Sequence, residues 1–327
     1  MNAAPLVSVV IPVFNAEKTI ENSLWSVFNQ SYRNLEIIAV NDGSTDKSEQ
    51  ILQSLNDPRF KVVSQRNRGA STARNEGLKN STGEFIQFLD ADDLLHLEKI
   101  SKQVALASEA EKNSIVLCNT GYFFDGDDPD FFKKYPPQDI YHFFDQPERF
   151  LLDLYGGSGK PNMVQPNAWL IPHNVVEKAG MWDEALTLDD DGEYFCRIVL
   201  ASTRILYVNE TLNFYRKYRN QHSLSTPNER QKMESQIMAL QLKRAYLSAY
   251  ENRETFKKAF SHQYSSLEVK LYPNYPDLYR RVRQEREQLG LRFTMPGIGS
   301  NLTNKLARSL DWRLIRMIQE AKKSLLR

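Results

Sequence analysis

Three aspartates stand close together directly after a short apolar run. Phe85 to Leu89 is mostly apolar, and Asp90, Asp92 and Asp93 follow it without a spacer. Such a run is typical of a strand covered on both faces, and open α/β sheets bind ligands at the carboxyl ends of their strands. Clustered carboxylates repel one another, and a hard divalent cation readily accepts oxygen ligands. The pattern therefore predicts a cation site, with an acidic strand end that caps the next helix as the alternative.

Alternating strands and helices are predicted to position these aspartates. The predicted strands cover residues 6–14, 35–40, 60–63, 85–89 and 115–118. Helices of about 10 to 15 residues between them indicate βαβ units, hence a parallel sheet with right-handed crossovers. Asp42 follows the second strand as Asp90 follows the fourth. We therefore expect both acidic groups at one edge of an α/β sheet.

The later part of the chain is less regular. Residues 122–163 break the pattern, and Gly156 to Pro161 indicates a flexible connection, either a lid or acceptor loop or a plain surface excursion. Regular structure resumes at 167–171, and beyond residue 228 the pattern predicts helices over 229–262 and 277–289. We expect a main domain over 1–226 and a helical C-terminal extension over 227–327.

Composition narrows the class of protein. The 327 residues carry a formal net charge of +1, so nothing global points to a nucleic-acid partner. Two cysteines far apart, Cys118 and Cys196, do not suggest a disulfide framework and favour a reduced, cytoplasmic compartment. The first residues do not resemble a signal peptide, and no apolar run approaches the roughly 20 residues that span a bilayer. We expect a soluble or peripheral protein.

The last 26 residues combine charge with an apolar face. Residues 302–327 contain seven lysines or arginines and two acidic residues, a net charge of +5. The apolar positions that fall mainly on one helical face are Leu302, Leu306, Leu310, Leu314, Met317, Ile318 and Leu325. A basic amphipathic helix can lie on an anionic membrane surface, here the inner face of the membrane. Docking on its own domain or on a partner chain is the alternative.

Four motifs occur in the order and spacing of a known family. They are Val7-Ser-Val-Val-Ile-Pro-Val-Phe-Asn15, Val40-Asn-Asp-Gly-Ser-Thr-Asp46, Asn67-Arg-Gly-Ala-Ser-Thr-Ala-Arg-Asn75 and Leu89-Asp-Ala-Asp-Asp93. Together they resemble the inverting glycosyltransferase family 2 over about residues 6–225. The resemblance implies a GT-A fold, a Rossmann-like, mostly parallel sheet flanked by helices. It also implies metal-assisted transfer of a sugar from a nucleotide-diphospho-sugar to a carbohydrate or lipid-linked glycan acceptor, in polysaccharide or glycoconjugate synthesis.

The resemblance assigns residues to the donor. The nucleotide-binding positions it implies are Pro12, Phe14, Asn15, Asp42, Asn67, Gly69 and Asp90, with Asp42 on the base and Asp90 on the ribose. Asp92 is implied as the ligand of a divalent Mn or Mg ion, with Asp93 and His222 as further candidates. Such an ion would neutralise charge on the leaving diphosphate. Arg74 is left open between stabilising its helix and approaching phosphate.

The family's base motif is matched by Asp190-Asp-Gly-Glu-Tyr-Phe-Cys-Arg197. An acceptor hydroxyl needs a positioned carboxylate to take its proton, and the family's catalytic Asp falls on Asp191. Asp190 stands where relatives have Glu, and Glu193 where they have Asp. Because three aspartates run from 189 to 191, the alignment can slip by one, so Asp190 is the second candidate. The alternative is an acidic helix N-terminus.

Polar and aromatic residues further along are assigned with alternatives. His222 follows the last strand, either as a metal ligand or as a surface histidine, and Arg216 or Arg219 is expected near phosphate. Trp169 and Trp182 flank the implied acceptor side, where they either stack on a sugar or belong to the core.

Two other classes of protein remain as alternatives. A nucleotidyltransferase also joins such a sheet with a nucleotide and a metal, but it usually has a glycine-rich phosphate loop after the first strand, where this chain has Pro12 to Asn15. A non-catalytic sugar-nucleotide-binding or scaffold protein is the other, and the retained carboxylates disfavour it. No Gly-x-Gly-x-x-Gly follows the first strand, which argues against a dinucleotide oxidoreductase.

Overall fold

The computed structural model describes residues 4–126, 145–218 and 229–325. The chain folds into two compact units. The first contains residues 1–148 and 164–226, and the second contains 149–163 and 227–327. The short segment 149–163, which the sequence analysis placed within the first domain, therefore belongs to the helical second unit.

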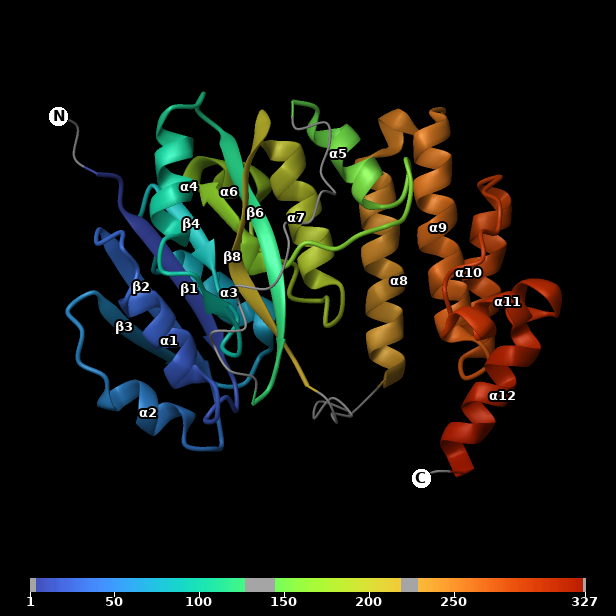
Figure 1. Cartoon of the computed structure of the whole chain (residues 1–327), viewed down its shortest axis with the longest axis horizontal. Coiled ribbons are helices and arrows are strands. Elements are labelled where there is room, and N and C mark those ends of the chain that lie inside the picture. Colours follow the sequence, from blue (N-terminus) through green and yellow to red (C-terminus); the bar gives the residue numbers. More distant parts are fainter. Residues whose placement is uncertain (1–3, 127–144, 219–228, 326–327) are drawn as a thin grey trace. The chain divides into compact units, whose positions relative to one another are not determined.

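A mixed sheet forms the centre of the first unit (Figure 1). Within the described residues its strands are β1 (Val7–Val13), β2 (Leu35–Asp42), β3 (Phe60–Gln65), β4 (Phe85–Phe88), β5 (Leu94–Leu95), β6 (Ser114–Phe124), β7 (Trp169–Pro172) and β8 (Arg204–Lys217). Their order is β3-β2-β1-β4-β7-β6-β8-β5. β1, β2, β3 and β4 pair in parallel, which confirms the predicted βαβ units. β7 runs antiparallel between β4 and β6, which the alternation pattern did not predict.

Six helices described in the first unit connect or flank the strands. They are α1 (Ile20–Phe28), α2 (Ser48–Ser54), α3 (Ala70–Lys79), α4 (Lys99–Ser108), α6 (His173–Ala179) and α7 (Asp190–Ala201). The sequence prediction of an α/β sheet flanked by helices is confirmed, with the correction that the sheet is mixed.

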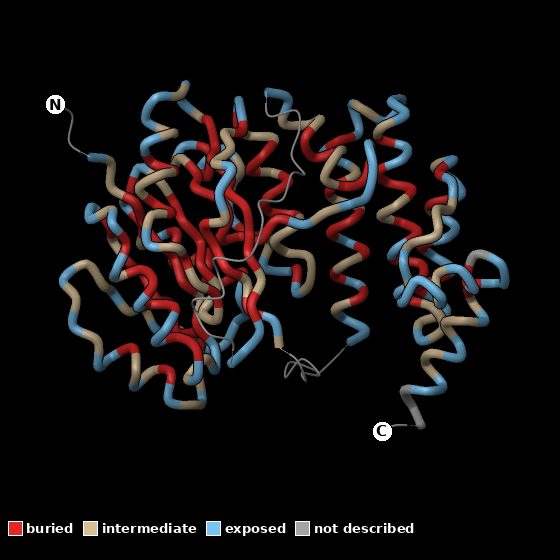
Figure 2. The backbone as a smooth tube through the Cα atoms, viewed as in Figure 1, coloured by how far each residue is buried: buried red, intermediate tan, exposed pale blue. Residues whose placement is uncertain are grey.

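Strand β1 is central because it is apolar on both sides. Val9 and Ile11 pack in one core cluster with Leu24 of α1. Val10, which lies between these two residues along the strand, points to the opposite face of the sheet and contacts α3. A Cβ on Gly77 of α3 would lie 2.3 Å from the Val10 side chain. Glycine at 77 thus lets α3 pack directly on the sheet. Figure 2 shows the resulting buried layer between the helices and the strands. The two helix layers fix where the loops that follow each strand emerge.

The second unit is helical in its described part. Its helices are α5 (Pro147–Leu154, which begins at the boundary), α8 (Glu229–Tyr246), α9 (Glu254–Leu271), α10 (Pro276–Gln288), α11 (Asn301–Ser309) and α12 (Trp312–Leu325). The single helix predicted over 229–262 is two helices, because a 3₁₀ turn at Ser248–Tyr250 and an extended Arg253 interrupt it. No helix in the described ranges has both the length and the apolar character needed to cross a bilayer.

Candidate active site

A pocket of about 460 Å³ lies where the carboxyl ends of β1, β2 and β4 meet. Its lining includes Pro12, Phe14, Asn15, Asp42, Asn67, Gly69, Arg74, Asp90, Asp92, Tyr215 and Tyr218. All seven residues that the sequence assigned to the nucleotide line this one pocket, and Asp92 lies with them. Parallel strands bring their ends to one edge, and that is why residues about 80 positions apart meet here.

Asp42 organises the loop that faces it. Its carboxylate accepts hydrogen bonds from Gln65 Nε2 (2.7 Å) and from the backbone N–H groups of Arg68 and Gly69 (2.8 Å each). Gly69 has φ +92°, a conformation that side-chain-bearing residues rarely adopt, and it immediately precedes α3. Asp42 therefore shapes the β3–α3 loop, and its contact with a nucleotide base stays a prediction.

The end of β1 is held against the loop after β2. Asn15 adopts a left-handed conformation, with φ +49°, and its Oδ1 accepts a hydrogen bond from Thr45 N at 2.8 Å. Its own N–H donates to Ser44 Oγ at 3.1 Å. The neighbouring Phe14 is 48% exposed and lines the pocket, where its ring offers a flat apolar wall.

The three clustered aspartates have different surroundings. Asp90 accepts a hydrogen bond from Arg74 Nη2 at 2.8 Å, and Asp92 accepts one from the Tyr218 hydroxyl at 3.0 Å. Asp93 is buried and accepts from Asn167 Nδ2 and from the Arg216 N–H, at 3.0 and 2.9 Å. Burial, together with the charges of Asp92 and Asp90, raises the pKa of Asp93 well above its ordinary value. The prediction of Asp93 as a metal ligand is wrong for this structure, because both of its oxygens brace the core.

Asp90 and Asp92 form the donor set that suits a hard cation. Both line the pocket, and burial and the charge of Asp90 raise the pKa of Asp92. Mg²⁺ and Mn²⁺ commonly bind through one or two carboxylates, with substrate phosphates as further ligands, so the residues present fit such an ion. Among the residues with a described placement, no group of three or more His, Cys, Asp and Glu side chains is arranged around a metal position. His222 and Arg219 lie outside the described residues.

Tyr215 of β8 and Tyr218, which directly follows β8, complete the wall beside Asp92. Tyr215 and Tyr218 line the pocket, and burial with the charges of Asp93, Asp92 and Asp90 raises the pKa of Tyr215 to about 12. The sequence analysis did not predict a role for either tyrosine, because the charged residues around them were the stronger signal for phosphate binding. Arg216, expected near phosphate, is buried instead: it donates to the Asp92 carbonyl and to Asp125 Oδ1, at 2.8 Å each.

Arg74 links the pocket to the start of α7. Its side chain is 8% exposed, and it donates from Nη2 to Asp90 and from Nη1 to Asp190 Oδ2 at 3.0 Å. The guanidinium lies 4.5 Å from the ring centroid of Trp182. Burial lowers the pKa of Arg74, but Asp90 and Asp190 outweigh it and hold that pKa above its ordinary value. Arg74 thus braces Asp90 and Asp190, and its approach to phosphate stays a prediction.

The two base candidates are distinguished by their partners. Asp190 accepts from Arg74 and from Ser71 Oγ at 3.0 Å. Asp191 accepts from the Gly192 N–H at 2.8 Å and has no ion pair within the described ranges. Burial, Asp190 and Asp189 raise the pKa of Asp191 to about 6, although Arg74 opposes them. The raised pKa of Asp191 therefore suits it to take a proton near neutral pH.

The rest of the base motif is structural. Glu193 and Arg197 form a two-point ion pair, with Nε–Oε1 at 2.7 Å and Nη2–Oε2 at 2.8 Å. Arg197 also donates to the Ala179 carbonyl at the end of α6. These contacts of Glu193 and Arg197 therefore hold α7 against α6 and fix the orientation of the first turn of α7.

The two tryptophans predicted on the acceptor side lie in the core. Trp169 and Trp182 are 1% and 2% exposed. Trp182 stacks on Tyr194 at 4.0 Å between ring centroids, and Trp169 stacks on Phe195 at 5.5 Å. Neither ring has a free face for a sugar, so the prediction that they stack on an acceptor sugar is wrong and the core alternative is right. Both rings pack against aromatic side chains of α7.

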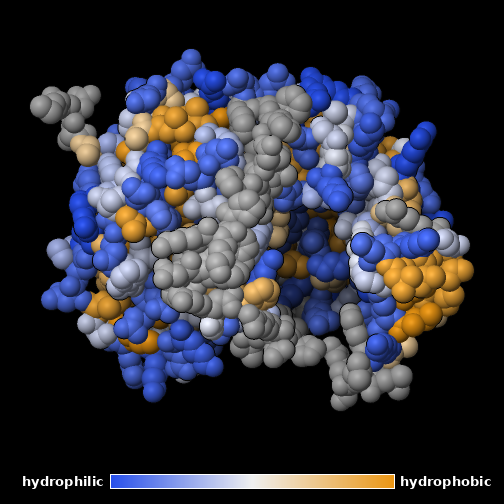
Figure 3. Space-filling model, viewed as in Figure 1, coloured by the Kyte–Doolittle hydropathy of each residue, from blue (hydrophilic) through white to orange (hydrophobic). Residues whose placement is uncertain are grey.

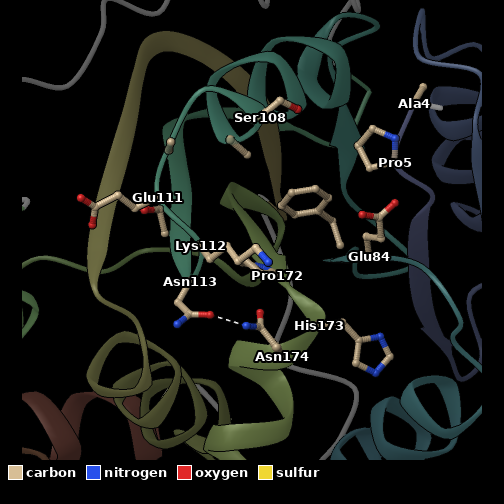
Figure 4. Close-up of a pocket in the computed structure, with 14 residues that line it drawn as sticks. Ala4, Pro5, Glu84, Ser108, Glu111, Lys112, Asn113, Pro172, His173 and Asn174 are labelled. Carbon is tan, nitrogen blue, oxygen red and sulfur yellow. Dashed lines mark hydrogen bonds between the residues drawn. The ribbon is translucent and has the colours of Figure 1, made fainter. Parts of the chain in front are cut away.

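A second pocket, of about 780 Å³, lies at the opposite edge of the sheet (Figure 4). Phe85 begins β4 and Ser114 begins β6, so it lies at the amino ends of these strands. Asn113 and Asn174 hydrogen-bond across it, beside His173 and Glu84. None of the residues predicted to do chemistry lines this pocket.

The chain resembles glycosyltransferases both in its sequence and in its fold. The model of the family described as glycosyl transferase family 2 matches residues 8–170, and the chain belongs to that family. An uncharacterized glycosyltransferase of Haemophilus influenzae is 39% identical over 123 residues, which is 37% of this chain and 48% of the relative. Glycosyltransferase GlyG of Streptococcus pneumoniae is 29% identical over 222 residues, 65% of this chain and 71% of GlyG.

Other relatives are much longer than the matched part. Glycosyltransferase GlyA of S. pneumoniae is 28% identical over 219 residues, which cover 64% of this chain and only 30% of GlyA. Among solved structures, S. aureus TarS 1-349 in complex with UDP-GlcNAc superposes with a TM-score of 0.60 at 20% identity, covering 89% of this chain and 94% of that one. This likeness confirms the predicted GT-A fold.

Proposed function

We propose that this protein transfers a sugar from a nucleotide-diphospho-sugar to an acceptor hydroxyl, with inversion at the anomeric carbon. The observation that carries the proposal is the pocket itself: seven predicted nucleotide-binding residues and Asp92 line it together, and Arg74 joins it to the helix start that bears Asp191. TarS has been solved with UDP-GlcNAc and with UDP, which supports a nucleotide-sugar donor and makes uridine nucleotides the first to test.

In this proposal the nucleotide occupies the β1–β2 side of the pocket. Phe14 packs on the base, the ribose lies at Asp90, and Gly69 lets the backbone approach the nucleotide closely. The diphosphate then points toward Asp92. A divalent cation held by Asp92, with the substrate phosphates as further ligands, would supply charge neutralisation for the departing diphosphate. Tyr218 orients the Asp92 carboxylate through its hydroxyl.

Asp191 is the proposed general base. The acceptor oxygen forms a bond to the anomeric carbon while the bond from that carbon to the donor phosphate oxygen breaks, and the nucleoside diphosphate leaves with the electron pair. The acceptor proton passes to Asp191. With a pKa of about 6, Asp191 is mostly deprotonated at neutral pH yet still a useful proton acceptor. Asp190, held by Arg74 and Ser71, positions the turn.

Release of nucleoside diphosphate from a panel of UDP-, GDP- and dTDP-sugars, with and without Mn²⁺ or Mg²⁺, tests the proposal. We expect metal-dependent release from one donor class, and loss of about 10²-fold or more in Asp191→Asn. Near-normal turnover in a folded Asp191→Asn protein would overturn the base assignment. Absence of any metal-dependent nucleotide binding by calorimetry would instead favour a scaffold protein. A cytoplasmic location and a role in polysaccharide or glycoconjugate synthesis stay predictions.

A further inference from the structure

The C-terminal helices expose a row of large apolar side chains. The exposed residues are Leu302, Leu306, Leu310, Leu314, Met317 and Ile318, spaced mostly four residues apart through α11, its end and α12. Figure 3 shows apolar side chains gathered on this part of the surface. A single exposed leucine is ordinary in a soluble protein, but a contiguous group of them marks a surface that binds something.

The opposite side of the same helices is already docked on the second unit. Trp312 is buried, and its ring stacks on Phe293 with 5.5 Å between centroids and 11° between planes. Arg316 Nε donates to the Val269 carbonyl at 3.2 Å, and Gln319 Nε2 donates to the Ile298 carbonyl at 2.9 Å. One alternative from the sequence was docking on the chain's own domain. Such docking accounts for this inner side, but it leaves the row of exposed apolar residues, called the leucine row below, uncovered.

The net charge around the row is positive. Residues 302–327 carry a net charge of +5. The two acidic residues there are both paired, Asp311 with Arg313 at 3.3 Å and Glu320 with Arg316 at 3.1 Å. Lys305 and Lys322 are exposed on α11 and α12. The partner that fits is therefore apolar within and negative at its surface.

We propose that α11 and α12 bind an anionic lipid bilayer. The leucine row enters the boundary between headgroups and acyl chains, and Lys305 and Lys322 meet the lipid phosphates, as interfacial amphipathic helices do. A bilayer accepts a row of leucines without a shaped cavity. A second copy of this chain fits less well, because a symmetric contact through this face would bring two segments of charge +5 together.

Cosedimentation of the full chain with vesicles tests the proposal. The vesicles are phosphatidylcholine alone, or phosphatidylcholine with about a third phosphatidylglycerol. We expect binding at least about tenfold stronger to the anionic vesicles, and weaker binding at high salt. The triple variant Leu306→Ser, Leu314→Ser, Ile318→Ser should lose binding to both. Lys305→Gln with Lys322→Gln should lose mainly the preference for anionic lipid.

The matched control is Leu97→Ser, which removes an exposed leucine of the first unit and should bind vesicles like the wild type. Circular dichroism checks that each variant is folded. Equal binding to both vesicle types, or wild-type binding by the triple variant, would overturn the proposal. So would light scattering that shows a wild-type dimer and a monomeric triple variant. The measurement needs no donor or acceptor, so its failure is separate from a failure of the proposed function.

Discussion

Arg74 of α3 and Asp190 of α7 form a partly buried ion pair, with 3.0 Å between Nη1 and Oδ2, across 116 positions of sequence. The same guanidinium holds Asp90 at 2.8 Å. One cation therefore serves a carboxylate of the donor pocket and a carboxylate next to the proposed base. Because Asp190 is neutralised in this way and Asp191 is not, the pair also determines which of two adjacent aspartates is suited to take a proton.

Arg74→Ala is expected to destabilise the protein and to abolish transfer. Removing the cation leaves Asp90 and Asp190 without their common partner in a buried setting, which costs about 3–5 kcal/mol of unfolding free energy. Denaturant unfolding measures this loss. Arg68→Ala is the control: its ion pair with Glu184 is exposed, so the expected change is about 0–1 kcal/mol. Similar losses in the two variants would contradict the bracing role of Arg74.

The rate of transfer should rise with pH through about 6. Asp191 must be deprotonated to act as a base, and burial with the charges of Asp190 and Asp189 raises its pKa to about 6. Asp190→Asn removes one of those charges, so the acidic limb of the kcat/KM profile should move to lower pH. A profile whose acidic limb is unchanged in Asp190→Asn would show that Asp191 is not the group that titrates.

Asp191→Asn should make the folded protein more stable at neutral pH while it loses activity. The pKa of Asp191 is about 6 in the folded state against an ordinary value of 3.8, so the folded state holds a proton that the unfolded chain has released. Between these values stability falls as pH rises, and above pH 6 the charged Asp191 costs up to about 3 kcal/mol. Thermal unfolding should show the gain at pH 7.5 and little of it at pH 3.5. A destabilised variant at pH 7.5 would contradict this prediction.

Asp92→Asn and Asp93→Asn should fail in different ways. Asp92 lines the pocket, so its variant should need at least about tenfold more Mn²⁺ or Mg²⁺ for half-maximal donor binding. Asp93 is buried with Asn167 and Arg216 as partners, so its variant should lose about 1–3 kcal/mol of stability and keep the metal dependence of the folded fraction. Metal titration by calorimetry and denaturant unfolding separate the two effects. An unaltered metal requirement in Asp92→Asn would remove it from the donor set.

Tyr218→Phe probes the hydroxyl that bonds Asp92 at 3.0 Å. Loss of a partner that orients a metal ligand commonly weakens metal affinity by about 10–100-fold. We expect the lower part of that range, because the substrate phosphates supply further ligands in the proposed function. Tyr207→Phe is the control, because Tyr207 lies on β8, the strand that precedes Tyr218, but is absent from the pocket lining. Equal metal affinities in the two variants would exclude the orienting role.

Much of the donor pocket could be predicted from the sequence. Apolar runs that end at Pro12, Asp42 and Asp90 indicate buried parallel strands, and parallel strands place their carboxyl ends at one edge. That geometry follows from strand direction alone, so it needs no knowledge of individual contacts. It is the reason why all seven predicted nucleotide positions line one pocket.

Only the tertiary structure decided what each charged or aromatic group does there. Asp92 and Asp93 are neighbours in sequence, yet one faces the pocket and the other the core, because Asn167 and the strand β8 approach from far along the chain. From the sequence, Trp182 could either stack on a sugar or belong to the core. In the structure, α7 packs so that Tyr194 stacks on the Trp182 ring. The role of a side chain depends on partners that long-range packing brings to it. Which strand ends meet at one edge of the sheet depends instead on strand pattern and direction, and these can be recognised in the sequence.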